Sequence, residues 1–313
     1  MNPRERTPHV KVAVIGGAGG IGSSVAFSLL RTDHPYEIVV IDNRENMIVS
    51  HVMDLQDALS LGGARSVVGG VMADAMDADI VVLSAAVPLK LNTSRDVFLT
   101  DNAAIVGSIV DQLVAGGFAG IFLLMTNPVD PLLTWVARRT GWVRERLLGY
   151  TLNDTQRFRT GIAQALEVAP QRVSCWVVGE HGPGAVQVFS TVTLDGKPVD
   201  LTPEQRAHAL DYAQNWYVRH VALDSGRTST WSSGIGGALM VDAIARPTDE
   251  PFPASVILEG EYGVTGISSS SPVILGAQGL VKVIEIPLTS DESTQFVEAA
   301  DKIDELTRVI EGQ

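Results

Sequence analysis

Three ionisable side chains in the middle of the sequence have types and spacings that could act on a small acid. Asp154 and Arg157 are three residues apart in a predicted helix, so both project from one face of it. His181 lies in the run Gly179-Glu180-His181-Gly182, and an imidazole exchanges protons near neutral pH. Reduction of a 2-oxo acid requires a proton donor, a cationic clamp for the carboxylate and a polarising charge. A surface ion pair and a packed histidine are the structural alternatives.

A glycine-rich turn follows the first apolar run of the chain. It contains the pattern GxGxxG at Gly17, Gly19 and Gly22 and leads into a predicted helix. Gly17 would permit the tight turn, Gly19 the approach of a pyrophosphate, and Gly22 the close packing of the helix on the sheet. Backbone N–H groups at the helix start would bind the phosphates. The expected cofactor-binding residues of this turn are Gly17, Gly19, Gly20, Ile21 and Gly22.

A carboxylate follows twenty residues after Gly22, where the second predicted strand ends in Asp42. A carboxylate there can accept hydrogen bonds from the adenosine ribose hydroxyls and would repel a 2'-phosphate. The sequence therefore predicts NAD as the cofactor. Arg44, two residues further on, could pair with a 2'-phosphate, which keeps NADP open.

The elements that position these residues follow two different patterns. Up to about residue 150, short β-rich runs alternate with helical patterns, as in a doubly wound parallel sheet of the Rossmann type. Beyond it, the pattern is that of a second, α+β region. We therefore expect an α/β protein with a cofactor domain at residues 1–150 and a substrate domain at residues 151–313. Strands are expected at residues 10–15, 37–42, 79–84 and 120–125, then within 173–194 and 256–286, and helices from residues 20 and 96, at 154–167, 203–220 and 232–245, and from 291.

Ordered motifs along nearly the whole chain resemble those of the lactate/malate dehydrogenase family. They are Thr126-Asn127-Pro128-Val129-Asp130 after a strand, the run from Asp154 to Arg159 on a helix, and Gly179-Glu180-His181-Gly182, together with the glycine turn and Asp42. The resemblance implies an NAD-dependent dehydrogenase that moves a hydride between the nicotinamide and a small L-2-hydroxy or 2-oxo acid.

The resemblance also implies roles for individual residues. His181 corresponds to the general acid/base, Asp154 to the carboxylate that orients it, and Arg157 to the bidentate clamp for the substrate carboxylate. Arg95 corresponds to the arginine of a mobile loop that closes over the substrate and polarises its carbonyl. Asn127 corresponds to a residue near the substrate oxygen and the nicotinamide ribose. Ser229 is carried over as a substrate contact and Asn102 as a cofactor contact.

The loop before Arg95 departs from the family pattern. Malate dehydrogenases usually carry an arginine six positions before the loop arginine, and lactate dehydrogenases typically carry glutamine, whereas this chain has Leu89. A leucine cannot pair with a second carboxylate, so it favours an apolar substrate side chain, as in hydroxyisocaproate-type relatives. Lys90 keeps dicarboxylates open if the loop register shifts by one residue. Leu91-Asn92 replaces the usual Pro-Gly, and Pro183 replaces the usual aspartate.

The composition of the chain limits the kinds of partner and the cellular compartment that we expect. The net charge of -13 is spread along the chain, which disfavours nucleic acid as a partner. The single cysteine, Cys175, excludes an internal disulfide and fits a reducing compartment. No apolar run approaches the length of a membrane helix, so we expect a cytoplasmic protein with no membrane partner. By resemblance it is a homodimer or homotetramer, and the apolar helical face at residues 235–244 could serve such contacts.

Two rival functions come from other classes. One is a non-catalytic, regulatory NAD-binding protein, against which the presence of Arg95, Asp154, Arg157 and His181 together argues. The other is a related NAD-dependent glycosidase that holds a metal with cysteine and histidine. Cys175 lies six residues before His181 without a second clear ligand, so no metal site is expected. Malate or lactate dehydrogenase proper remains the alternative within the family.

Overall fold

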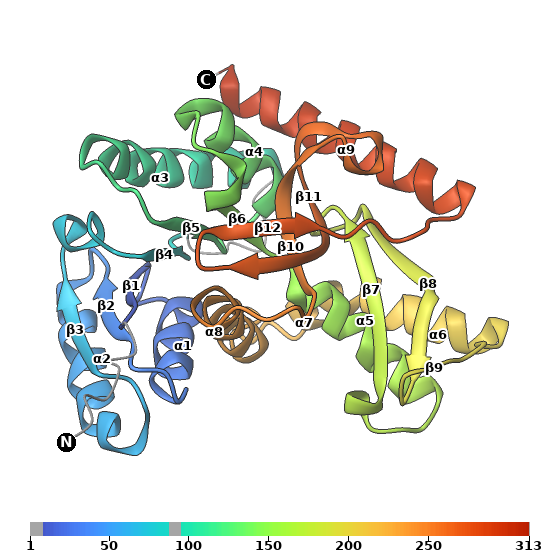
Figure 1. The fold of residues 1–313 in the computed structure, drawn as a ribbon, viewed down its shortest axis with the longest axis horizontal. Coiled ribbons are helices and arrows are strands. Elements are labelled where there is room, and N and C mark those ends of the chain that lie inside the picture. The colour runs from blue at the N-terminus through green and yellow to red at the C-terminus, as the bar shows by residue number, and fades with distance from the viewer. Residues whose placement is uncertain (1–8, 88–94, 313) are drawn as a thin grey trace, which may run out of the picture.

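Short, mostly apolar runs form six parallel strands in a computed structural model that describes residues 9–87 and 95–312 (Figure 1). The strand order is β3-β2-β1-β4-β5-β6, which is the doubly wound order of dinucleotide-binding sheets. The strands are β1 (Lys11–Ile15), β2 (Glu37–Ile41), β3 (Ser66–Gly70), β4 (Ile80–Leu83), β5 (Ile121–Leu124) and β6 (Leu147–Tyr150), and the helices among them are α1 (Gly20–Leu30), α2 (Glu45–Ala58), α3 (Arg95–Ala115) and α4 (Val129–Thr140). The predicted parallel sheet is confirmed.

Two of these strands are absent from the sequence prediction. β3 reads SVVGG, and its paired glycines resemble a turn, while β6 has only four residues, LLGY. Both are held by pairing rather than by local propensity, since β3 lies along β2 and β6 along β5.

The rest of the chain continues the same sheet with antiparallel strands. β10 pairs with β6, and the order then runs β10-β11-β7-β8-β9, with β12 on β11. The elements are α5 (Leu152–Ala165), β7 (Val173–Gly179), β8 (Ala185–Leu194), β9 (Lys197–Pro198), α6 (Pro203–Gln214), α7 (Trp216–Ala222), α8 (Trp231–Ala245), β10 (Phe252–Glu259), β11 (Thr265–Gly276), β12 (Gly279–Val283) and α9 (Ser290–Glu311), with single 3-10 turns at Leu59–Leu61, Met72–Ala75, Arg144–Arg146, Pro170–Arg172 and Glu261–Gly263. A mixed second region is therefore present, but it shares one sheet with the first.

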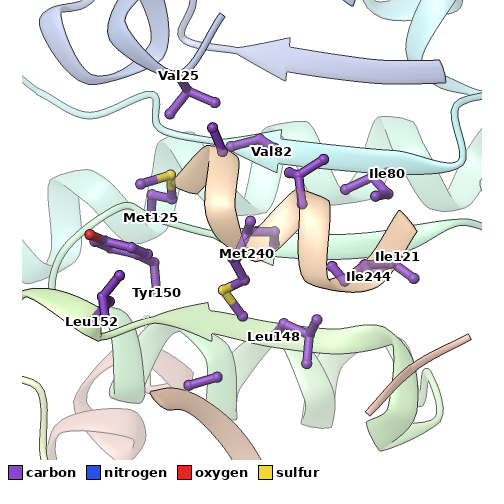
Figure 2. Packing of buried hydrophobic residues seen from close by; sticks show 14 of the residues in the cluster. Val25, Ile80, Val82, Ile121, Met125, Leu148, Tyr150, Leu152, Met240 and Ile244 are labelled. Atoms are coloured by element: carbon purple, nitrogen blue, oxygen red, sulfur yellow. The ribbon is translucent and has the colours of Figure 1, made fainter. Parts of the chain in front are cut away.

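Helix α8 returns from the second region to cover the parallel sheet. Figure 2 shows Met240 and Ile244 of this helix packed among apolar side chains of β4, β5 and β6, such as Ile80, Ile121 and Leu148. Each fully buried side chain of this size contributes about 1.5–3 kcal/mol. The helix therefore ties the two regions together, and the boundary at residue 150 remains a prediction.

The longest helices are α3 and α9, with 21 and 22 residues. Thr289 and Glu292 form a capping box at the start of α9, which satisfies backbone donors there. Within residues 9–87 and 95–312, no helix combines the length and apolar character that a membrane span requires.

Candidate active site

The turn after β1 falls on Gly16, a residue that the sequence analysis did not single out. Gly16 has φ +86, and a Cβ there would lie 2.5 Å from the backbone nitrogen of Ala85. Gly17, where the tight turn was expected, lies in the same turn, which covers residues 16–18. Gly17 packs closely on Val40, and a side chain at Gly22 would meet the Gly16 carbonyl at 2.4 Å. The signal for Gly16 was its place as the first glycine after the strand.

The start of α1 fits a dinucleotide phosphate. Gly19 is the N-cap and has no side chain that could occupy the first-turn N–H groups, which include those of Gly20 and Ile21. A Cβ on Gly20 would lie 3.2 Å from Thr230 Oγ1, so the segment before α8 borders this turn. Ser229 lies in that segment, half-buried, with its hydroxyl 3.0 Å from Ser232 Oγ.

Asp42 directly follows β2, and all its acceptor positions are engaged within the chain. Its Oδ1 accepts from the backbone nitrogen and Nε of Arg44, both at 3.1 Å, and its Oδ2 accepts from Ala18 N at 3.1 Å and Arg44 Nη2 at 3.4 Å. Burial would raise the pKa of Asp42, but these hydrogen bonds outweigh it and lower the pKa, so the carboxylate is ionised. Ribose hydroxyls can therefore hydrogen-bond to the Asp42 carboxylate only if Arg44 gives up its own hydrogen bonds to it.

Asn127, which follows β5, is hydrogen-bonded to Asn102 of α3. The Asn102 amide nitrogen donates to the Asn127 carbonyl at 2.7 Å, and its amide oxygen accepts from Val87 N at 2.8 Å. Asn102 is completely buried, and its expected contact with the cofactor stays a prediction. Its amide fixes Asn127 to Val87, the last residue described before the loop.

His181, Asp154 and Arg157 come together from two elements. Asp154 lies in the first turn of α5 and accepts from His181 Nδ1 at 2.5 Å, while its other oxygen is 3.8 Å from Arg157 Nη1. Burial would lower the pKa of His181, but the charge and hydrogen bond of Asp154 and the charge of Asp130 raise it above its usual value. Since Nδ1 is bonded to Asp154, Nε2 is the ring nitrogen that can exchange a proton with a substrate.

Aromatic side chains surround the guanidinium of Arg157. Its central carbon lies 4.1 Å from the ring centroid of Trp216, the first residue of α7. The hydroxyls of Tyr150, Tyr212 and Tyr217 are near enough to influence its charge. The sequence analysis missed Trp216, because nothing in its spacing places it beside a helix sixty residues earlier.

Several expected site residues cannot be placed. Leu89, Lys90, Leu91 and Asn92 lie outside the described residues, and so does the side chain of Arg95. Pro183 is described and lies in the short turn between β7 and β8.

Cys175 is buried on β7. Its thiol donates to the Thr155 carbonyl at 3.8 Å, and burial raises its pKa to about 12. In the part of the chain that the structure describes, no three His, Cys, Asp or Glu side chains gather as metal ligands would.

The glycine turn, Asp42, Val87 and Asn127 follow β1, β2, β4 and β5, so they meet at the carboxyl edge of the parallel sheet. A glycine turn that fits a dinucleotide phosphate and a carboxylate after β2 at that edge, with an imidazole, a carboxylate and a guanidinium grouped in the second region, are typical of α/β dehydrogenases that use a dinucleotide.

The comparison with known families agrees. Residues 10–149 match the lactate/malate dehydrogenase NAD binding domain, and residues 151–312 match the alpha/beta C-terminal domain of the same enzymes. The chain belongs to the lactate/malate dehydrogenase family, and it is an NAD-dependent L-2-hydroxy acid dehydrogenase.

Relatives with different specificities are similarly distant. The chain is 35% identical to an L-lactate dehydrogenase of Lactobacillus delbrueckii subsp. bulgaricus over 94% of this chain and 96% of the relative, and 30% identical to a malate dehydrogenase of Nitratiruptor sp. over 97% and 96%. Among solved structures, a minor L-lactate dehydrogenase from Enterococcus mundtii gives a TM-score of 0.88 at 28% identity, covering 96% of this chain and 98% of that one.

Proposed function

We propose that this enzyme transfers a hydride from NADH to a 2-oxo acid with a branched aliphatic or aromatic side chain, giving NAD+ and the L-2-hydroxy acid, and catalyses the reverse reaction. The observation that carries the chemistry is the grouping of His181, Asp154 and Arg157, with His181 Nδ1 2.5 Å from Asp154 Oδ2. The observation that carries the substrate class is Leu89, six positions before Arg95.

The proposed roles follow from the charges of these side chains. Arg157 binds the substrate carboxylate, and His181 Nε2 donates a proton to the carbonyl oxygen while Asp154 stabilises the imidazolium. Bound NADH supplies the hydride to the carbonyl carbon. Arg95 polarises the carbonyl, Asn127 hydrogen-bonds near the reacting oxygen, and Ser229 contacts the substrate. In the reverse reaction, neutral His181 accepts the hydroxyl proton.

The substrate side chain is proposed to lie against Leu89. An apolar side chain there gains about 1.5–3 kcal/mol of burial, whereas a second carboxylate would lose its hydration without a partner. The aromatic residues near Arg157, among them Trp216 and Tyr217, support an apolar substrate. Two alternatives remain within the family. Lys90 supports a malate dehydrogenase that uses oxaloacetate. The sequence identity to L-lactate dehydrogenases supports a lactate dehydrogenase that uses pyruvate.

Initial rates of NADH oxidation with 2-oxoisocaproate, phenylpyruvate, pyruvate and oxaloacetate test this proposal. We expect the first two to exceed oxaloacetate in kcat/KM, and Leu89→Arg to move the preference toward oxaloacetate. Leu61→Arg, at an exposed leucine outside the site, is the matched control and should change nothing. Oxaloacetate as the best substrate of the unchanged enzyme would mean that a cation such as Lys90 reaches the pocket. Absence of turnover with every acid would favour the regulatory NAD-binding protein.

We also propose how the chain is divided and assembled. Residues 1–150 form the NAD-binding domain, and residues 151–313 form the substrate domain, which carries Asp154, Arg157 and His181. Three neighbouring helices expose apolar side chains, with Trp231, Ile235 and Leu239 of α8 at 68%, 58% and 50%, Phe27 on α1 and Met53 on α2. A second copy of the chain would cover them, giving a homodimer or homotetramer. A lone buried thiol fits a cytoplasmic location.

A further inference from the structure

A second carboxylate, besides Asp154, is hydrogen-bonded to the segment that carries His181. Asp130, in the first turn of α4, is completely buried, and its Oδ2 accepts a hydrogen bond from the His181 backbone nitrogen at 2.5 Å. The proposed reaction uses Asp154 on the imidazole ring, but it assigns nothing to Asp130. A buried carboxylate is costly unless each oxygen is hydrogen-bonded, so its presence here requires a reason.

The other oxygen of Asp130 is held by a relay of serines. Ser255 on β10 donates its hydroxyl to Asp130 Oδ1, and the Ser268 hydroxyl on β11 lies 2.6 Å from Ser255 Oγ. The backbone nitrogen of Ser268 donates to Thr134 Oγ1 on α4 at 2.9 Å, which closes the path on the helix of Asp130. The relay therefore joins α4, β10 and β11, three elements of the rigid core, to the His181 segment.

The segment that carries His181 needs such an anchor. It begins at Gly179, which has φ +91, a conformation that glycine enters freely and does not itself hold. Glu180 Oε2 accepts from Gly184 N at 2.8 Å, which ties the turn to itself but not to the core. Within the described residues, His181 is hydrogen-bonded to the rest of the fold through its ring to Asp154 and through its backbone nitrogen to Asp130.

The charges around His181 come from three elements. Asp130 on α4 and Asp154 on α5 both favour the imidazolium, and Arg157 on α5 opposes it. Glu180, in the turn itself, is close enough to act on Asp130. Burial raises the pKa of Asp130 to about 7, and hydrogen bonds from Ser255 and from the His181 backbone oppose that rise. The serine relay therefore helps to keep the carboxylate charged.

We propose that Asp130 is a positioning residue of the active site, which fixes the His181 backbone through Oδ2 and is itself held by the Ser255–Ser268 relay. This inference rests on the proposed role of His181 as the acid/base. Asp154 then orients the ring while Asp130 sets the position of the backbone that carries it. The two carboxylates together keep the imidazole protonated for reduction.

Asp130→Asn, Ser255→Ala and the control Ser271→Ala test this inference. Asparagine keeps the shape and removes the charge, and Ser255→Ala removes the relay. Ser271 is buried on β11 like Ser268, but its hydroxyl has no hydrogen-bond partner in the described part of the chain. The measurements are kcat and KM for the best 2-oxo acid, NADH affinity, and the midpoint of the His181 imidazole titration by NMR.

We expect Asp130→Asn to lower kcat roughly tenfold to hundredfold and to move the His181 midpoint to lower pH, with NADH affinity nearly unchanged. Ser255→Ala should change both in the same direction by less, and Ser271→Ala should change neither. If Asp130→Asn does not fold, the comparison of Ser255→Ala with Ser271→Ala in kcat and in the His181 midpoint tests the positioning role.

An unchanged His181 midpoint in folded Asp130→Asn, or equal behaviour of the two serine variants, would overturn the positioning role. A normal kcat in His181→Ala would instead refute the proposed acid/base itself, whatever Asp130 does.

Discussion

Two carboxylates bond His181, Asp154 through the imidazole ring and Asp130 through the backbone nitrogen. Because the pKa of His181 is raised above its usual value of 6.5, the protonated form persists below the raised pKa and is lost as the pH rises through it. Reduction of a 2-oxo acid needs that form, and oxidation of a 2-hydroxy acid needs the neutral form.

Asp154→Asn should therefore move the decline of the reduction rate to lower pH and reduce kcat/KM at neutral pH roughly a hundredfold. The pH profile of kcat/KM in the reducing direction is the measurement. Asp195→Asn, at an exposed carboxylate paired with Arg172, is the control and should leave the profile in place. An unchanged midpoint of the pH profile in Asp154→Asn would contradict the conclusion that Asp154 raises the pKa of His181.

Arg44 competes with the ribose for Asp42, because its Nε and Nη2 take one acceptor position on each carboxylate oxygen. The Arg44 side chain is 54% exposed, and such an ion pair is worth about 0.2–1 kcal/mol. Arg44→Ala should thus bind NADH up to about fivefold more tightly. It should bind NADPH more weakly, since the uncovered carboxylate repels a 2'-phosphate.

Fluorescence titration with each cofactor measures both effects. Arg65→Ala removes a comparable exposed arginine, paired with Glu37 at the opposite end of β2, and should leave both affinities unaltered. Weaker NADH binding by Arg44→Ala would show that Arg44 holds the cofactor rather than competing with it.

The helix predicted at residues 203–220 is two elements, α6 and α7, and this break matters for the site. The backbone of Asn215 leaves the helical region between them, with φ -96 and ψ 4. The hydrophobic pattern is compatible with either arrangement, so only packing against α5 selects the break. Its consequence is that Trp216 lies over Arg157.

Trp216→Ala should raise KM for the 2-oxo acid and lower kcat/KM about threefold to thirtyfold, because a stacked cation is worth about 0.5–2 kcal/mol. The affinity for NADH should stay unchanged, because Trp216 contacts Arg157, the proposed ligand of the substrate carboxylate. Trp216→Phe keeps a ring at the position and should restore most of the loss. Equal losses in the two variants would mean that stacking does not position Arg157.

At the scale of the whole molecule, α8 has one face buried on the parallel sheet and another exposed. Trp231, Ile235 and Leu239 recur every four residues on the exposed face, which is the spacing of a helical contact stripe. A stripe of this kind on a monomer would remain in water, so we expect a second copy to cover it.

Light scattering after size exclusion should give the mass of a dimer or tetramer, and Leu239→Glu should shift it toward the monomer. Val143→Glu, at an exposed valine away from α8, is the matched control. A monomeric parent chain, or an unchanged mass in Leu239→Glu, would refute assembly through this face.

The sequence alone determined four of the six parallel strands, the dinucleotide turn with its acid and the pairing of Asp154 with Arg157, because each shows in residues close together along the chain. Within that turn, the close approach of Ala85, which follows β4, and the positive φ of Gly16 add a second requirement for glycine that the local pattern did not single out. Tertiary structure alone decided that Asn102 binds backbone groups and that α8 covers the sheet. It also decided that one oxygen of Asp130 accepts a hydrogen bond from the backbone of His181, 51 residues away, and the other accepts one from Ser255, 125 residues away. The hydrogen-bond partners of a buried group depend on which strands and helices pack together, and no local pattern of residues records that.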